Sequence, residues 1–305
     1  MLHADGNARV TGFARVVVYG FWFAVVARTP VVPWADLPRM LFRAPGVLRW
    51  LPDAYWSLFL QAPVLAVFKV VLLTGCALVV AGVRPHTPVA LATAGLLLLF
   101  DGTIQGFNWF LNHAQAAMLY AAIILAVFPA ADGLSVLGPA RRPARAALYA
   151  APMLVVALVF CLAYAFIGTH RVAVGGAGIF TGDAIVTFLA TTGAEPGRYG
   201  LLPTLYPALR PLFRLGFTVV TGFEILAPLA LVSRRFRWLW LAVIVPFHLS
   251  TYFLMNILFW ENLLLIAVFL TDLPAAVVRA LPTRSRGDAT TRPRGEASPR
   301  PNPLA

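Results

Sequence analysis

Long apolar stretches separated by short polar segments constrain the fold of this sequence most. A helix needs about 20 mostly apolar residues to cross a bilayer. Only helices and closed barrels can cross it, because only they satisfy all their backbone hydrogen bonds without water. Hydrophobic residues make up 60% of the 305 residues and charged residues only 12%, too few to cover a water-soluble globule. The sequence therefore predicts an all-α, polytopic transmembrane helical bundle in the cell membrane, with the lipid bilayer as its surrounding partner.

The apolar stretches predict about eight spans. The candidate spans are 10–28, 56–83, 87–101, 113–131, 145–168, 209–232, 237–255 and 257–272. The last two are nearly continuous, so seven spans with a re-entrant segment is the alternative. Residues 1–281 form the predicted transmembrane domain. Residues 282–305, rich in arginine and proline, have almost nothing to bury and predict a disordered tail.

The arginines predict the orientation of the bundle. Most of them precede the first candidate span or follow the second, fourth, sixth and eighth. The positive-inside rule places these alternate loops in the cytoplasm, so both termini are predicted to be cytoplasmic. This orientation explains the net charge of +12. The basic residues form no face with interleaved aromatic residues, and a nucleic-acid partner is therefore not expected.

Three ionisable residues fall deep inside candidate spans, where charges usually face the bundle interior. They are Lys69 in the second span, Glu224 in the sixth and His248 in the seventh. Counted from the turn at 233–237, Glu224 and His248 lie at depths within roughly 4 Å of each other. We therefore expect a contact between them. Such a group either fixes helix packing or handles protons, and both interpretations stay open.

A second group of polar residues lies at the expected outer ends of the spans. Asn112 and His113 open the fourth span, Glu261 opens the eighth, and His170 follows the fifth. We expect His170 to line an outward-opening pocket, although loop hydration explains His113 equally well. Asn112, His113 and Glu261, together with Lys69, are the candidate cofactor-binding residues.

Two outer connections are long enough to carry structure of their own. Residues 29–55 mix tryptophan and arginine at intervals compatible with a short interfacial helix. Residues 169–208 are rich in glycine, threonine and proline, and predict a lid or binding loop. The sequence contains no P-loop, GxSxG, HExxH or CxxC motif. Its five histidines have no repeated spacing, so no metal site is predicted.

The order of features between residues 222 and 270 resembles bacterial membrane proteins related to vitamin K-dependent γ-glutamyl carboxylase, the horizontally transferred transmembrane (HTTM) family. The resemblance rests chiefly on Glu224 in one span and Phe247-His248 in the next, joined by an arginine-rich turn. Looser matches are Asn112-His113 and a Tyr-x-x-x-Gly element at 164–168. The resemblance would cover residues 10–272.

This resemblance implies a membrane enzyme linked to a quinone or another lipid, with a site that faces the extracytoplasmic side. The carboxylases use reduced vitamin K, oxygen and CO2, with a lysine base after the Tyr-x-x-x-Gly element. Here that place holds His170 and no lysine, and the large glutamyl-binding domain is missing, which argues against γ-carboxylation. We therefore expect His170, His248 and Glu224 as the catalytic groups. The alternative is a non-catalytic protein, either a small-solute transporter or a structural subunit of a membrane complex.

Overall fold

The computed structural model describes residues 6–108, 113–137, 144–181, 183–191 and 199–281, and every regular element in these ranges is a helix. Five helices are long and apolar enough to cross a membrane: α1 (Ala8–Arg28), α3 (Ala62–Ala81), α4 (His86–Asn108), α6 (Ala146–Gly175) and α12 (Arg234–Met255). A sixth span results if α13 (Trp260–Phe269) and α14 (Leu273–Ala280) are counted together across their 70° bend. The all-helical class is confirmed, while the count of eight spans stays a prediction.

Three candidate spans are shorter or more broken than the apolar stretches suggested. The stretch at 56–83 divides into α2 (Asp53–Phe59) and α3, and α3 carries Pro63 in its first turn. The stretch at 209–232 divides into α10 (Arg210–Ile225) and α11 (Leu229–Val232) around Pro228, which lacks the backbone N–H that a continuous helix would need. α5 (His113–Val127) has only 15 residues, about 22 Å of helix.

The two outer connections also differ from expectation. Residues 29–55 form successive short 3₁₀ helices instead of one interfacial α-helix. These are η1 (Val32–Asp36), η2 (Arg39–Leu41) and η3 (Gly46–Trp50). The expected loop at 169–208 is largely helical in its described part, because α6 continues to Gly175. The elements that follow are α7 (Gly178–Thr181), α8 (Ala184–Thr191), α9 (Leu202–Leu205) and η5 (Pro207–Leu209).

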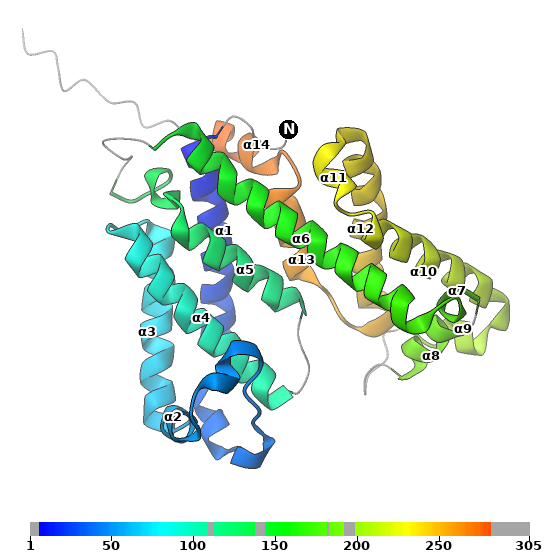
Figure 1. The fold of residues 1–305 in the computed structure, drawn as a ribbon, viewed down its shortest axis with the longest axis horizontal. Helices are drawn as coiled ribbons and strands as arrows, with labels where there is room; N and C mark the ends of the chain where they lie inside the picture. Colours follow the sequence, from blue (N-terminus) through cyan, green and yellow to red (C-terminus); the bar gives the residue numbers. More distant parts are fainter. Residues whose placement is uncertain (1–5, 109–112, 138–143, 182, 192–198, 282–305) are drawn as a thin grey trace, which may run out of the picture.

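The helices pack into two groups joined by α6. α1, α3, α4 and α5 pack against one another, and α6 runs diagonally along this group and carries α10, α11 and α12 on its other side (Figure 1). α13 and α14 lie near α1 and α5, and η4 (Ala130–Asp132) packs on α1. One continuous hydrophobic core extends through both groups, from Trp22 to Trp240. The long helix α6 therefore gives residues of both groups a common support.

Candidate functional site

Glu224 and His248 are both buried, with 3% and 4% of their surfaces exposed, but each is hydrogen-bonded to α6. The guanidinium of Arg171 donates to Glu224 Oε2 at 2.6 Å and to Oε1 at 3.3 Å. The hydroxyl of Tyr164 forms a short hydrogen bond with Nε2 of His248. No direct hydrogen bond between Glu224 and His248 is found in the described part of the chain. The two residues are thus linked through α6, where Tyr164 and Arg171 lie about 10 Å apart along the helix axis.

The two α6 residues that bond to Glu224 and His248 lie on one face of that helix. Tyr164, Gly168 and Arg171 have the i, i+4, i+7 spacing that aligns side chains along a helix. Gly168 lies where α6 meets α10: a Cβ there would approach the Glu224 Cβ and the backbone N of Ile225 to 3.0 Å. A glycine at this point lets the two helix backbones come together, as small residues do between membrane helices.

α10 presents a matching face to Arg171. The guanidinium also donates to Oγ1 of Thr221 at 3.0 Å, and its carbon lies 4.9 Å from the centroid of the Phe217 ring. Phe217, Thr221 and Glu224 repeat the same helical spacing on α10. The Glu224 side chain is 4% exposed and that of Arg171 is 25% exposed. Arg171 therefore reaches from the accessible edge of the interface to a carboxylate in its interior.

Aromatic rings surround His248. Phe247 and Phe259 have ring centroids 5.3 Å and 5.6 Å from the imidazole, at inclined angles. On the inner side, the Tyr164 ring makes an edge contact with the fully buried Trp240 at 5.4 Å. Phe247 and Phe259 are only partly buried, so the aromatic shell extends from the core to the surface. This shell excludes water from the imidazole and leaves planar apolar surface around it.

The Tyr164–His248 pair can exchange a proton. When the phenol donates to Nε2, the neutral imidazole carries its own proton on Nδ1. Nδ1 is buried and has no hydrogen-bond partner among the described residues. A buried polar atom without a partner calls for a ligand, a water molecule or a catalytic role. The geometry therefore offers a protein-held N–H or N enclosed by the aromatic shell.

The structure gives His170 a different environment from the expected pocket. Its side chain is exposed, and its ring stacks on that of Phe166 at 5.9 Å, where Phe166 is itself 72% exposed. Adjacent residues of a helix point about 100° apart, so Arg171 faces α10 while His170 faces outward. The structure thus brings Arg171 to Glu224 and leaves His170 outside.

Lys69 likewise lies apart from Glu224 and His248. Its Nζ donates to the carbonyl oxygens of Ala27 at 3.1 Å and Thr29 at 2.8 Å. These carbonyls lie at the C-terminal end of α1, where the helix dipole stabilises a cation. Lys69 is the eighth residue of α3, about two turns from the start of that helix. The structure therefore brings Lys69 to the end of α1 and not to Glu224 or His248.

The remaining candidates are placed only in part. Glu261 is 7% exposed in the first turn of α13, two residues after the Phe259 that contacts His248. Asn112 lies outside the described residues. His113 begins α5, and its side chain is also outside the described part. Among the residues that the structure describes, no three His, Cys, Asp or Glu side chains gather as metal ligands would.

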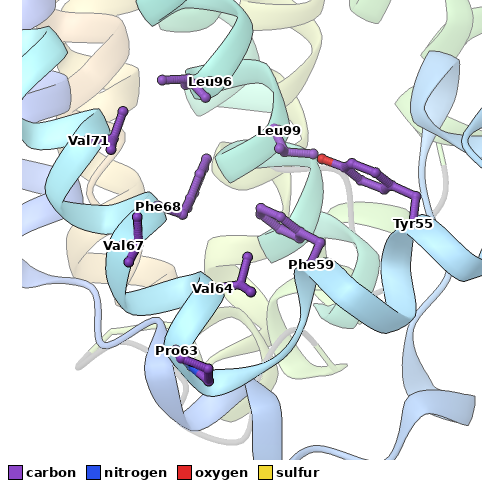
Figure 2. Close-up of a pocket in the computed structure, with 9 residues that line it drawn as sticks. All are labelled: Tyr55, Phe59, Pro63, Val64, Val67, Phe68, Val71, Leu96 and Leu99. Atoms are coloured by element: carbon purple, nitrogen blue, oxygen red, sulfur yellow. The ribbon is translucent and has the colours of Figure 1, made fainter.

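A separate cavity of about 540 Å³ lies on the other helical group, between α2, α3 and α4 (Figure 2). Its lining is Tyr55, Phe59, Pro63, Val64, Val67, Phe68, Val71, Leu96 and Leu99. The Tyr55 hydroxyl is the one polar side-chain group of this set. Val67 is 64% exposed on its wall, so the cavity opens sideways from the bundle. Apart from the Tyr55 hydroxyl, its lining side chains are apolar.

A second ionic cluster connects the segment before α8 with α10. Arg214 donates to Oδ1 of Asp183 at 2.6 Å, and Arg210 donates to Oδ2 at 3.3 Å. Asp183 falls in the predicted loop at 169–208, whereas Arg210 and Arg214 fall in the predicted span at 209–232, so no contact between them was expected. The signal was the i, i+4 spacing of the two arginines at the start of α10.

Acid is expected to release this cluster. The Arg214 hydrogen bond, and then the charges of Arg214 and Arg210, hold the pKa of the Asp183 carboxyl below its ordinary value. The contact therefore stabilises fully above the pKa of the unfolded chain, and this contribution is lost as pH falls through the lower pKa of the folded state. Hydrogen exchange should show α8 and the start of α10 losing protection between pH 6 and about pH 3. Asp183→Asn should show that lower protection already at pH 6; equal protection of both proteins at pH 6 would contradict the contact.

The site thus consists of a buried ion pair and a buried tyrosine–histidine pair on one face of α6, beside an aromatic shell. No protein-family model, curated protein or solved structure matches the chain.

Proposed function

We propose that the chain is a multi-pass membrane protein that binds a quinone-type lipid headgroup beside His248 and exchanges protons with it through the Tyr164–His248 pair. The observation that carries this proposal is the buried imidazole, bonded to Tyr164 on Nε2 and without a described partner on Nδ1. It lies among aromatic rings, on helices apolar enough to cross a bilayer.

The ligand class follows from the chemistry of the aromatic shell around His248. A quinone headgroup is flat and apolar, and inclined or offset aromatic rings are its favourable neighbours. Its carbonyl oxygens accept hydrogen bonds, and its reduced hydroxyls donate them, so either form can pair with Nδ1 of His248. Histidine is the side chain best suited to gaining or releasing a proton near neutral pH. The resemblance to the HTTM and carboxylase-like proteins supports the same class of ligand.

The partly buried edge of the aromatic shell supplies an entry route in this proposal. Phe247 on α12 and Phe259 in the segment before α13 reach the surface of the helical bundle. A lipid-soluble molecule in the bilayer meets that surface without crossing water. The ring would pass between these phenylalanines to reach His248, while the tail of the lipid stays among the acyl chains.

Arg171 and Glu224 act as positioning residues in this proposal. Their bidentate pair fixes the rotation of α6 against α10, and Tyr164 lies two turns away on the same face of α6. The pair therefore holds the phenol in register with the imidazole.

We further propose eight spans with both termini in the cytoplasm. Two of these spans would be short or broken: α5 alone, and α10 together with α11. Each would cross the membrane where the bilayer is locally thin. The alternation of arginine-rich loops supports this topology.

A structural subunit of a membrane complex is the second candidate. The satisfied Arg171–Glu224 pair and the Lys69 contact with the end of α1 favour it, since both hold helices together without any ligand. This candidate leaves the unpartnered Nδ1 of His248 without a role.

Quinone titration tests the proposal. The protein purified in detergent should retain an extractable quinone, or should show saturable quenching of tryptophan fluorescence by ubiquinone-1, because Trp240 contacts Tyr164. His248→Phe should weaken that binding more than about tenfold, as expected for one lost hydrogen bond in a dry site. His170→Phe makes the same substitution at an exposed position and should bind as the parent does. Absence of both bound quinone and saturable quenching would reject the quinone site and favour the structural subunit.

A further inference from the structure

A buried cation without a counter-ion lies near the opposite end of α6. Arg15 on α1 is 0% exposed. Its Nη2 donates to the carbonyl of Leu134 at 2.8 Å, while Nε and Nη1 have no partner among the described residues. No carboxylate of the described chain lies within ion-pair distance of this guanidinium. Both features are independent of the site on α10 and α12.

Such a cation requires a partner. The guanidinium of arginine does not deprotonate in proteins, so Arg15 cannot become neutral as a buried lysine can. An unpaired charge in a low-dielectric interior costs several kcal/mol by general estimates. One backbone carbonyl satisfies one of the three guanidinium nitrogens. Nε and Nη1 therefore need hydrogen-bond acceptors, and an anion would supply the missing negative charge as well.

His86 is the second buried group at this place. It is the first residue of α4, it is 9% exposed, and both of its ring nitrogens lack partners in the described part of the chain. It lies within electrostatic range of Arg15 and of Asp132. The Asp132 carboxylate accepts a hydrogen bond from the Tyr149 hydroxyl at 2.6 Å. Asp132 is thus engaged with α6 and does not pair with Arg15.

The backbone around Arg15 is shaped to enclose the guanidinium. Gly82 ends α3 with φ +70°, and a Cβ at this position would collide with Nη1 of Arg15. The Ser135 hydroxyl donates to the Gly82 carbonyl at 2.9 Å and ties residues 134 and 135 to the end of α3. The N-terminus of α4 adds the positive end of its dipole, which favours an anion.

We propose that Arg15 and His86 bind a small inorganic anion of the chloride class, which neutralises Arg15 and joins α1, α3 and α4. Two observations carry this assignment: the unpaired, fully enclosed guanidinium, and an imidazole within its electrostatic range that has no partner among the described residues. The enclosure favours a free ion over a lipid phosphate, because a lipid would bring its glycerol and acyl chains to a residue without exposed surface.

The site is tested by the anion dependence of stability. The full chain in detergent is melted in a series of buffers of constant ionic strength. In this series, sodium chloride or sodium bromide progressively replaces sodium gluconate. The melting temperature should rise saturably with either halide. His86→Phe should weaken the apparent halide affinity more than about tenfold, since a charge-assisted hydrogen bond is removed. Arg39→Met, which breaks an exposed ion pair, should leave the halide response unchanged.

Three further results distinguish a bound halide from water or a lipid phosphate. Arg15→Met should abolish the halide response. If this variant does not fold, the test rests on His86→Phe and on a bromide anomalous peak beside Arg15 in crystals of the parent. Equal melting temperatures in gluconate, chloride and bromide would overturn the proposal, because water would then satisfy Arg15. Stabilisation by phosphatidic acid vesicles and not by any halide would overturn it in favour of a lipid phosphate.

Discussion

Arg171→Met is expected to destabilise the protein by about 3 kcal/mol, the lower end of the cost of breaking a buried ion pair. The variant leaves the Glu224 carboxylate in an interior where its side chain is 4% exposed, with no cation to pair with. The lower end applies because the Arg171 side chain is itself 25% exposed, so water screens part of the interaction. The free energy of unfolding, measured by denaturant titration in detergent micelles, reports this change.

A double variant separates the ion pair from the packing. Arg171→Met combined with Glu224→Leu should recover most of the stability, since apolar residues of similar volume often replace a buried pair without loss. Arg171→Lys should be intermediate, because an ammonium keeps the charge and loses the bidentate geometry. The matched control is Arg39→Met: its partner Asp53 has a 98% exposed side chain, and the expected change is below about 1 kcal/mol. A change of similar size in Arg171→Met and Arg39→Met would mean that the Glu224 pair is not formed.

Hydropathy was sufficient to predict the helical class, and the depth of the ionisable residues was sufficient to predict that Glu224 and His248 are buried. Their partners could not be predicted from depth alone. Adjacent spans place two residues at one level, but the rotation of each helix decides which side chains meet. Tyr164 lies within the predicted span, but Arg171 reaches Glu224 because α6 continues to Gly175, whereas apolarity alone ended that span at 168.

The signal for these partners was present in the sequence as a spacing. Tyr164, Gly168 and Arg171 repeat at helical intervals across the predicted end of the span. Assigning the residues after 168 to a loop gave His170 and Arg171 equal access to a pocket. In a helix, His170 and Arg171 point about 100° apart and therefore contact different neighbours. The contact of Lys69 with the carbonyls at the end of α1 was likewise beyond what depth alone predicts.

Gly168→Val is the substitution expected to affect both stability and ligand binding. The Cβ alone would lie 3.0 Å from the Ile225 backbone N, and a backbone atom cannot move aside as a flexible side chain can. The two γ-carbons of valine would force α6 and α10 apart, at a cost of about 3 kcal/mol, the upper part of the usual range for overpacking.

The same displacement should misalign both functional pairs, because Gly168 lies between Tyr164 and Arg171 on the contact face of α6. Quinone quenching of tryptophan fluorescence should then weaken together with stability, and Gly168→Ala should give a smaller change in both. Gly216→Val is the matched control on α10, since a Cβ at that position meets no atom within 4 Å. It should retain full stability and binding. If Gly168→Val unfolds as readily as the parent and binds quinone equally well, then the close approach of α6 and α10 at Gly168 is not what aligns Tyr164 with His248.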